Sequence, residues 1–561
     1  VCLHIWLPER NTIMNRTLHT LFAAALAVVF AASVANANAY LTFSSTNAFS
    51  ITPKVNSWDG TLEYSTDAMT WEAFTTNGAA AATNAAGDYN LYLRGTSNTV
   101  MTGDAYTSGW KIAATGTVAC IGNIETLLDY ETVAAGQHPA MANGCFANLF
   151  YSWTNLTAAP TLPATNLAEY CYLSMFYRCT GLTNAPALPA STLAANCYEG
   201  MFFGCTGLTN APALPATNLA ASCYLSMFNA CTGLTEAPDL PAMNMLESCY
   251  SSMFSSCKGL ANAPALPATN LADSCYTYMF YKCPGLTNAP ALPAMDLTND
   301  CYRAMFHGCS GLTTPPELPA TNLAKSCYQN MFAACTGLTN APALPAAKLL
   351  YSCYFSMFRE CTGLTEAPEL PATTLAVQCY AEMFAACTGL TNAPALPAAN
   401  LAANCYFYMF RGCTGLTRLP ALPATNLSYF CYEYMFEDCT GITLYENGIG
   451  PTWSIPADAT EKNGWNEGML AGTSGSFTND PVIGVTYYYA SGPIFPADEA
   501  LVFDGTTLTI KIASAQSGFW YTLYSLDDLL EETWEKIESL QATGSELTFT
   551  MDLGTPPRPR L

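Results

Sequence analysis

Apolar and polar positions recur with a fixed period through the middle of the chain. Cys-Tyr pairs stand every 26 residues from Cys171 to Cys431, and each is followed by Met-Phe and then by a second Cys. A degenerate first copy begins at Cys145, where Trp153 replaces the second Cys, so twelve units follow one another without insertion. A period of this length predicts a solenoid, in which each unit buries its apolar face against its neighbours.

The first half of each unit has the pattern of a short amphipathic helix. Thr217-Asn218 precedes the apolar stretch, as at a helix start, and Gly233 follows it, as at a helix end. At about 100° per residue, the unchanging positions share one side and the variable positions share the other, except that the variable Ala230 falls among the unchanging ones. The predicted core of this unit comprises Leu219, Cys223, Tyr224, Met227, Phe228, Cys231 and Leu234.

The second half of the unit, such as Leu208 to Pro215, predicts a short strand beside the same strand of the next unit. Pro212 has no backbone N–H to donate, so only two or three residues per unit are expected to pair. The predicted fold class is therefore an α/β solenoid, a leucine-rich-repeat-like array of short strand plus short helix. Small all-β, sandwich-like domains are expected on both sides of it.

Composition shifts along the chain predict its division into seven segments. Met14 opens a segment with a positive start at Arg16, an apolar run and small residues before position 39, which is typical of a signal peptide. The segments are 1–13, an upstream non-native stretch; 14–39, the signal peptide; 40–118, an N-terminal β-sandwich-like domain; 119–144, a cap; 145–445, the solenoid; 446–489, a cap and linker; and 490–561, a C-terminal β-sandwich-like module. The last segment ends in PPRPRL without an apolar closing strand, which suggests a truncated reading frame.

The charge of the chain limits its partners. The formal net charge is -23 and the apolar fraction is 51%. This charge argues against nucleic acid and against anionic lipid as partners, because both need clustered Lys and Arg. With the signal peptide, this composition predicts a secreted or cell-surface protein whose mature chain does not insert into a membrane.

The cysteines are expected to be buried thiols. There are 25 Cys, and 22 of them lie in the eleven full repeats. Cys223 and Cys231 would lie about 12 Å apart along a helix, too far for a disulfide. No closely spaced Cys pairs occur, which argues against zinc. One bridge, between Cys120 and Cys145, remains open at the N-terminal edge.

No catalytic constellation or cofactor motif is evident. Beyond the signal peptide only His138 and His307 remain, and His307 occupies a variable, exposed position. The acidic residues of the array stand singly, without a pair suited to glycoside hydrolysis. The chain is therefore predicted to be no enzyme, without metal or cofactor.

The variable positions of the predicted helices are rich in aromatic residues and arginine, which are enriched at binding hot spots. They supply the candidate ligand-binding residues Tyr177, Arg178, Phe203, Tyr278, Tyr281, Lys282, Arg303, Phe355, Arg359, Phe407, Tyr408, Arg411 and Tyr434. Drift at unconstrained solvent positions is the alternative interpretation. The strand side, which carries mostly Thr, Asn and Ala, is a second possible binding face.

The repeat resembles that of BspA-like leucine-rich-repeat proteins of bacterial surfaces. MFFGCTGLTNAPALP at 201–215 is similar to their AFxGCTxLTxxxIP pattern and recurs in phase over roughly residues 120–445, with Pro212 where the family has a β-forming residue. The resemblance implies a leucine-rich-repeat solenoid that serves adhesion or host-factor binding.

Three functions follow as hypotheses, in order of preference. The first is an exported, adhesin-like binding protein whose partner is an extracellular protein or glycan, of host or microbial origin. The second is a structural spacer or display stalk, with binding or attachment in the flanking β modules. The third and weakest is an accessory part of a polysaccharide-degrading enzyme.

Overall fold

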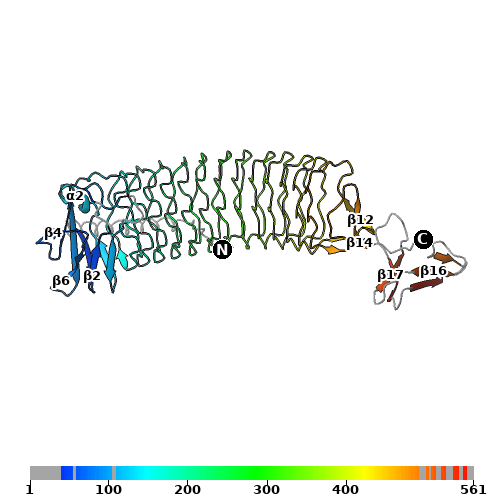
Figure 1. Cartoon of the computed structure of the whole chain (residues 1–561), viewed down its shortest axis with the longest axis horizontal. Coiled ribbons are helices and arrows are strands. Elements are labelled where there is room, and N and C mark those ends of the chain that lie inside the picture. The colour runs from blue at the N-terminus through cyan, green and yellow to red at the C-terminus, as the bar shows by residue number, and fades with distance from the viewer. Residues whose placement is uncertain are drawn as a thin grey trace, which may run out of the picture.

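The computed structural model describes residues 40–54, 58–103, 109–491, 501–503, 507–512, 520–525, 535–541 and 547–552 (Figure 1). Segments 1–13 and 14–39, and the chain end on which the truncation hypothesis depends, lie outside the described residues. Within the described part, no helix is long and apolar enough to cross a membrane.

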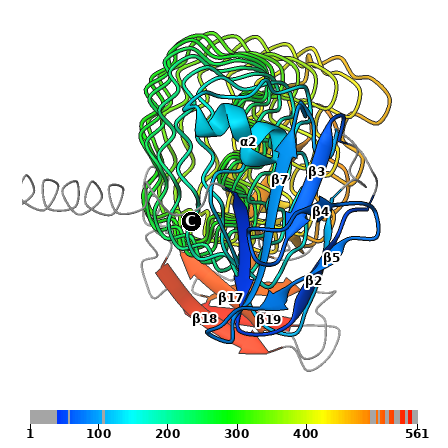
Figure 2. The ribbon, with the colours of Figure 1, turned by 90° about the vertical axis from the view of Figure 1, so that its left-hand side faces the viewer.

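Two sheets form the N-terminal region, which faces the viewer in Figure 2. The larger has the order β10-β9-β1-β7-β3-β4, with β6 paired to β7, and the smaller has the order β5-β2-β8. Their strands are β1 (Leu41–Ser45), β2 (Phe49–Thr52), β3 (Thr61–Ser65), β4 (Glu72–Ala73), β5 (Ala79–Ala80), β6 (Ala82–Thr83), β7 (Tyr89–Thr96), β8 (Lys111–Ala114), β9 (Val118–Ile121) and β10 (Leu156–Ala158). Since β10 belongs to the first repeat and pairs with β9 in parallel, the larger sheet continues directly into the array.

The array is a stack of coils, one for each 26-residue unit (Figure 1). The predicted helix is wrong, because residues 221–230 form successive turns. Every second amide closes a turn three residues back, as Leu225 N does on Ser222 O at 3.1 Å. The amides between them donate to the next coil, as Ser226 N does to Ser251 O at 2.8 Å. The chain is therefore mostly strands and loops rather than α/β, and α2 (Thr126–Ala134) is the one α-helix of the described residues.

Every fourth residue of these turns has a left-handed backbone. If the first Cys of each unit is position 1, these residues occupy positions 4, 8 and 26; for example, φ is 51° at Ser222, 54° at Ser226 and 60° at Ala230. From residue 148 to residue 438, none of these positions carries Val, Ile or Thr, the residues that tolerate positive φ least. A helical wheel places Ala230 beside the core, yet the equivalent position in other units carries small or polar residues. The need for positive φ at this position explains the difference.

The repeated residues form ladders inside the stack. Cys223, Tyr224, Met227, Phe228, Cys231 and Leu234 are buried, whereas Leu219 is half-buried. The ring centroids of Tyr224 and Tyr250 lie 5.7 Å apart, as do those of Phe228 and Phe254, and both pairs are nearly parallel. Stacked rings of this kind recur in successive coils, so each coil buries its apolar face only against its neighbours.

The cysteines satisfy backbone groups. All 24 cysteines of the described residues are free and buried, so the bridge left open between Cys120 and Cys145 is wrong. The second Cys of each unit donates its thiol to a backbone carbonyl of the preceding coil, as Cys231 does to Phe202 O at 3.0 Å. Phe202 O already accepts the Cys205 amide at 3.0 Å, so the thiol adds a second, weak hydrogen bond while the sulfur fills the apolar core.

Gly233 has a different role from the predicted helix cap. Its φ is not positive, and a Cβ at this position would lie 2.5 Å from Thr206 O of the preceding coil. Equivalent glycines meet the same carbonyl in the other coils, as Gly207 meets Thr180 O at 2.5 Å. The glycine is therefore required by the close approach of two backbones.

On the side of the stack opposite the turn segments, fewer backbone hydrogen bonds join neighbouring coils. The predicted strand, with two or three paired residues per unit, is reduced to single parallel bridges such as Asn184↔Asn210. A second column of single bridges, such as Asn400↔Asn426, lies where a helix start was predicted. Thr209 N donates to Thr183 O at 3.3 Å. The prolines between the two bridged positions of a unit, such as Pro394 and Pro397 between Asn392 and Asn400, have no amide to donate, which explains the short pairing.

A shortened thirteenth coil ends the stack. Tyr432 N and Phe436 N donate to Trp465 O and Met469 O, as if residues 465–473 were a further unit. The Asp480 carboxylate accepts the Met469 amide at 3.2 Å on the outer face of this coil. The same amide closes a local turn to Asn466 O at 3.0 Å, so the carboxylate shares it at the end of the stack.

The strands after the repeats form small separate sheets. β11 pairs with β13, β12 with β14 and β17 with β18, and β15, β16 and β19 form a three-stranded sheet. Their bounds are β11 (Thr443–Leu444), β12 (Gly448–Ser454), β13 (Ser474–Gly475), β14 (Thr486–Ser491), β15 (Leu501–Phe503), β16 (Thr507–Ile512), β17 (Trp520–Ser525), β18 (Glu535–Gln541) and β19 (Leu547–Asp552).

Replacing a left-handed residue by a β-branched one should weaken the stack. Ser226→Val is expected to lower the free energy of unfolding by about 1–3 kcal/mol, because valine at φ 54° is strained. Leu225→Val, at the neighbouring position without positive φ, should cost less. Urea denaturation of both variants tests this, and equal losses would contradict the left-handed assignment.

The thiols should be unreactive until the chain unfolds. Burial raises the pKa of Cys231 well above its usual range and that of Cys205 to about 12, so little thiolate forms at neutral pH. Titration with a thiol reagent should therefore detect almost none of the 24 described cysteines in the native protein and all of them in denaturant. Missing thiols in the unfolded chain would reveal disulfides and contradict the structure.

Candidate binding surface

The candidate binding residues lie along one edge of the stack, on the turns, and not on helices. They occupy positions 3, 4, 7 and 8 of their coils, and we call this edge the turn ridge. Positions 4 and 8 are the left-handed ones, so the side chains of the turn ridge project from a backbone fixed by hydrogen bonds to the next coil. The structure separates the candidate residues into three groups, with Phe355 half-buried and outside them.

In the first group, aromatic rings cover one another. Tyr151, Tyr177 and Phe203 occupy position 7 of three successive coils, and neighbouring centroids lie 4.7 Å apart. The Arg178 guanidinium lies 5.4 Å from the centre of the Tyr177 ring. Since both faces of Tyr177 are stacked, this group offers ring edges and one cation to a ligand.

The second group is centred on Tyr278 and Tyr281, whose rings meet edge to face at 5.4 Å. The Lys282 ammonium lies 5.0 Å from the centre of Tyr281, and the Arg303 guanidinium 5.9 Å from the centre of Tyr278. His307 stacks on Tyr281 at 4.9 Å, so it is half-buried and not fully exposed. Burial, and then the nearby Lys282 charge, lowers the pKa of His307, which favours the neutral imidazole.

The third group binds its cations to carboxylates. Arg359 pairs with Glu382 at 2.9 Å, and Arg411 pairs with Glu437 at 2.7 Å. Tyr408 stacks on Tyr434 at 4.9 Å. Phe407 meets the Tyr408 ring at 4.3 Å. The cations of this group are therefore already paired within the protein.

Two residues of the turn ridge, Tyr151 and His307, were not among the candidates. Tyr151 begins the first ladder and is 37% exposed. Both could have been found by aligning position 7 of consecutive units, because residues 26 apart are neighbours in a stack. A list of the variable residues of a single unit does not show which side chains of neighbouring coils lie next to each other.

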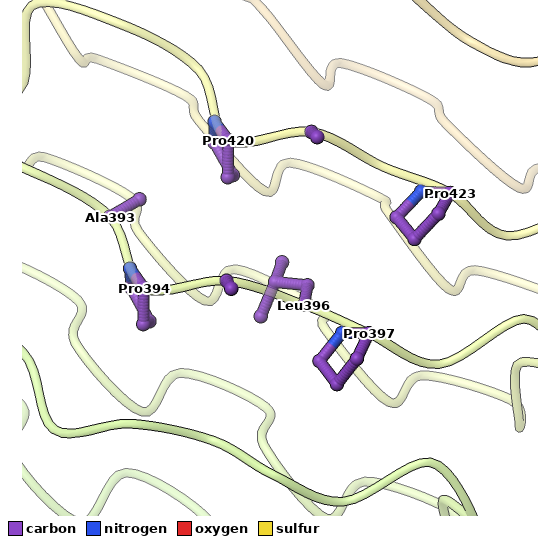
Figure 3. A pocket seen from close by; sticks show the side chains of 8 residues that line it. Ala393, Pro394, Leu396, Pro397, Pro420 and Pro423 are labelled. Atoms are coloured by element: carbon purple, nitrogen blue, oxygen red, sulfur yellow. The ribbon is translucent and has the colours of Figure 1, made fainter.

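The opposite side carries a shallow apolar depression of about 290 Å³ between two consecutive coils (Figure 3). It is lined by Pro394 and Pro397 of one coil and by Pro420 and Pro423 of the next, with Ala and Leu side chains between them. No charged or hydroxyl side chain lines it, so it offers no directional recognition.

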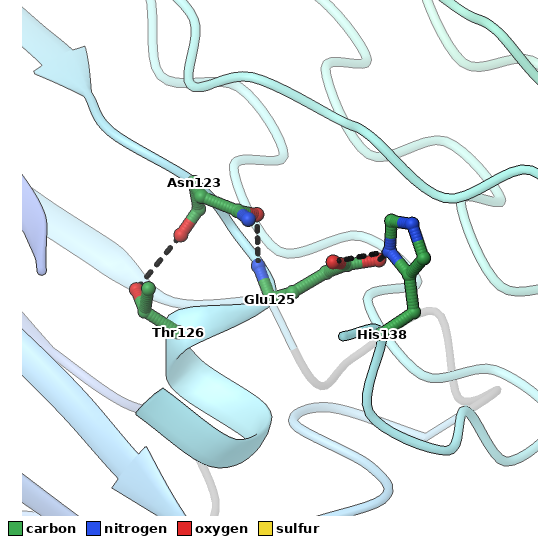
Figure 4. A network of polar contacts seen from close by, with 4 residues as sticks. All are labelled: Asn123, Glu125, Thr126 and His138. Atoms are coloured by element: carbon green, nitrogen blue, oxygen red, sulfur yellow. Dashed lines mark hydrogen bonds and ion pairs between the residues drawn. The ribbon is translucent and has the colours of Figure 1, made fainter. Parts of the chain in front are cut away.

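A buried carboxylate occupies the N-terminal region (Figure 4). The side chain of Glu125 is 1% exposed and lies 2.8 Å from His138 Nδ1, which belongs to a half-exposed ring. The Asn123 side chain accepts the Glu125 amide at 2.9 Å. Burial raises the pKa of Glu125, and His138 partly opposes this shift. His138 is therefore a hydrogen-bond partner of the buried Glu125 carboxyl group.

This carboxylate should make stability depend on pH. Because the pKa of Glu125 in the folded protein lies above that of an exposed glutamate, stability is greatest below the unfolded pKa and falls as pH rises through the folded pKa. Glu125→Gln should remove this part of the profile of melting temperature against pH. Glu131→Gln, at an exposed position of α2, is the matched control and should keep the wild-type profile, whereas a Glu125→Gln profile parallel to wild type would contradict the assignment.

No cluster of three His, Cys, Asp or Glu residues that could hold a metal ion occurs in the described part of the chain. The turn ridge supplies aromatic rings, hydroxyls and cations, groups that are common at binding hot spots.

The comparisons with known proteins find no match. No protein-family model, no curated protein and no solved structure matches the chain. The likeness to BspA-like proteins therefore depends on the repeat motif alone.

Proposed function

We propose that the protein is an exported or cell-surface binding protein, adhesin-like in its role, that presents the turn ridge to an extracellular protein or glycan. The observation that carries the proposal is the second group of the turn ridge. There two tyrosines, Lys282 and Arg303 lie side by side on a rigid backbone, with ring contacts of 5.4 Å and cation–ring distances of 5.0 and 5.9 Å. Rigid tyrosines next to cations lose little entropy on binding.

The signal-peptide pattern and the acidic charge support an extracellular location. The resemblance to BspA-like surface proteins adds support for adhesion and names no ligand.

A structural spacer is the second candidate, and a specific observation favours it. The rings of the first group stack on one another at 4.7 Å, and the cations of the third group are paired with Glu382 and Glu437. Much of the aromatic and charged content of the turn ridge therefore stabilises neighbouring coils. On this alternative, ligands bind to the flanking β regions.

A binding screen separates the two functions. The purified chain is applied to immobilised matrix proteins, mucins and glycans, together with the double variant Tyr278→Ala/Arg303→Ala. We expect the double variant to lose at least about tenfold in affinity for the ligand that is found, since tyrosine and arginine dominate hot spots. Glu236→Ala/Asp239→Ala, two exposed positions on the opposite side, is the matched control and should bind as wild type.

Equal binding by the wild type and both double variants would contradict a binding role for the turn ridge and favour the spacer.

A further inference from the structure

The exposed apolar side chains of the array gather in one part of the coil, outside the turn ridge. Between residues 145 and 445, nine large apolar side chains are exposed, and seven of them occupy positions 21–25 of their units. We call these positions, in residues 165–429, the flank band. The six central apolar residues of the band are 40–50% exposed: Met243, Leu246, Met295, Leu350, Tyr351 and Val377. Exposed apolar groups that gather in this way mark an interaction surface.

The charges of the flank band are divided between its two halves. Its acidic residues all lie before residue 300: Glu169, Glu247, Asp273 and Asp296. Its lysines both lie after residue 300: Lys325 and Lys348. All six side chains are exposed, and none makes an ion pair with another described residue. The band therefore has an acidic half and a basic half, and neither is neutralised within the described chain.

The charged side chains next to the middle of the band are held by contacts to neighbouring coils. The Asp273 carboxylate accepts the Asn299 amide at 3.0 Å. The Lys325 ammonium lies 5.4 Å from the centre of the Tyr351 ring. Side chains that are already held in place lose less entropy when a partner binds.

The flank band is complementary to itself in one orientation. Two copies that lie side by side in antiparallel directions bring the acidic half of each against the lysine half of the other. Apolar side chains meet as well, because both halves carry them, as Leu246 and Val377 show. A parallel pair would instead set acidic residues against acidic residues. The charge pattern thus favours a second copy of this chain as the occupant of the band.

The acidic charge of the whole chain limits but does not prevent this contact. The formal net charge of -23 makes two copies repel each other at long range. At physiological ionic strength the Debye length is about 8 Å, so only charges near the contact act strongly. From residue 300 to residue 429 the flank band has no acidic residue, so its local charge there is positive.

We infer that the flank band is the interface of an antiparallel dimer of this chain, related by a two-fold axis near the middle of the band. The apolar side chains supply contact area, and the opposite charges fix the orientation. The turn ridge occupies positions 3, 4, 7 and 8 and so lies outside the band. The dimer is therefore independent of the proposed function and carries two turn ridges.

Sedimentation equilibrium of the full chain at physiological ionic strength tests the dimer. The wild type should dimerise with a dissociation constant in the micromolar range. Tyr351→Ser/Val377→Ser should raise this constant at least about tenfold, because apolar contact area is lost. Both residues occupy position 25, which carries Glu, Ala, Asp, Asn or Lys in other units, so the variant should fold as wild type.

A charge exchange tests the antiparallel orientation. Lys325→Glu/Lys348→Asp makes the whole band acidic, and Glu247→Lys/Asp273→Lys makes most of it basic. Each new residue already occupies the same position in another unit, so both variants should keep the wild-type melting temperature. Each variant alone should be monomeric, and an equimolar mixture of the two should form a heterodimer, because each half again faces the opposite charge.

Lys111→Glu/Lys258→Glu is the matched control, since it makes the same change of net charge at two exposed positions outside the flank band. It should dimerise as wild type. A wild type that is monomeric throughout the micromolar range would overturn the dimer, as would wild-type dimerisation of either charge variant of the band. A mixture of the two folded charge variants that stays monomeric would overturn the antiparallel arrangement.

Discussion

The structure depends on a backbone that divides its hydrogen bonds between itself and the next coil. In the turn segments, one amide closes a local turn and the next, such as Ser226 N, donates to a carbonyl of the neighbouring coil. A left-handed residue at every fourth position makes this alternation possible. Buried backbone groups are thus satisfied without a helix or a regular strand, and the stack grows by repeating one unit.

The side chains of each unit follow from this arrangement. Rings stack because the backbones repeat at a distance that suits parallel aromatic faces. The second Cys donates its thiol to a carbonyl that also accepts the amide of a local turn, so that carbonyl has two donors. Gly233 is small because a neighbouring carbonyl approaches it. Positions 3 and 7 of the turn ridge escape these demands, whereas positions 4 and 8 must also accept positive φ. The choice of residue at positions 4 and 8 is therefore limited by the backbone. Variation at these positions is not by itself evidence that they bind a ligand.

The periodicity of the sequence predicts the stacked coils and the buried side chains, but not the conformation of the turn segments or the pairing of rings on the turn ridge. The 26-residue step predicts the stack, and the unchanging positions predict which side chains are buried, because both depend only on spacing. The helix prediction is wrong because apolar residues at 223, 224, 227, 228 and 231 suit one face of a helix as well as a series of four-residue turns. The absence of Val, Ile and Thr at positions 4, 8 and 26 was the available signal for the turns. The pairing of ring faces could be inferred only after residues 26 apart were compared.

The central claim is that each turn segment is bonded to the next coil and not to itself as a helix. Solution NMR of the labelled protein can detect scalar coupling across a hydrogen bond, between the amide nitrogen of Ser226 and the carbonyl carbon that accepts its proton. The account predicts coupling to Ser251, in the following coil. Coupling to Ser222, four residues earlier, would show an α-helix and contradict it.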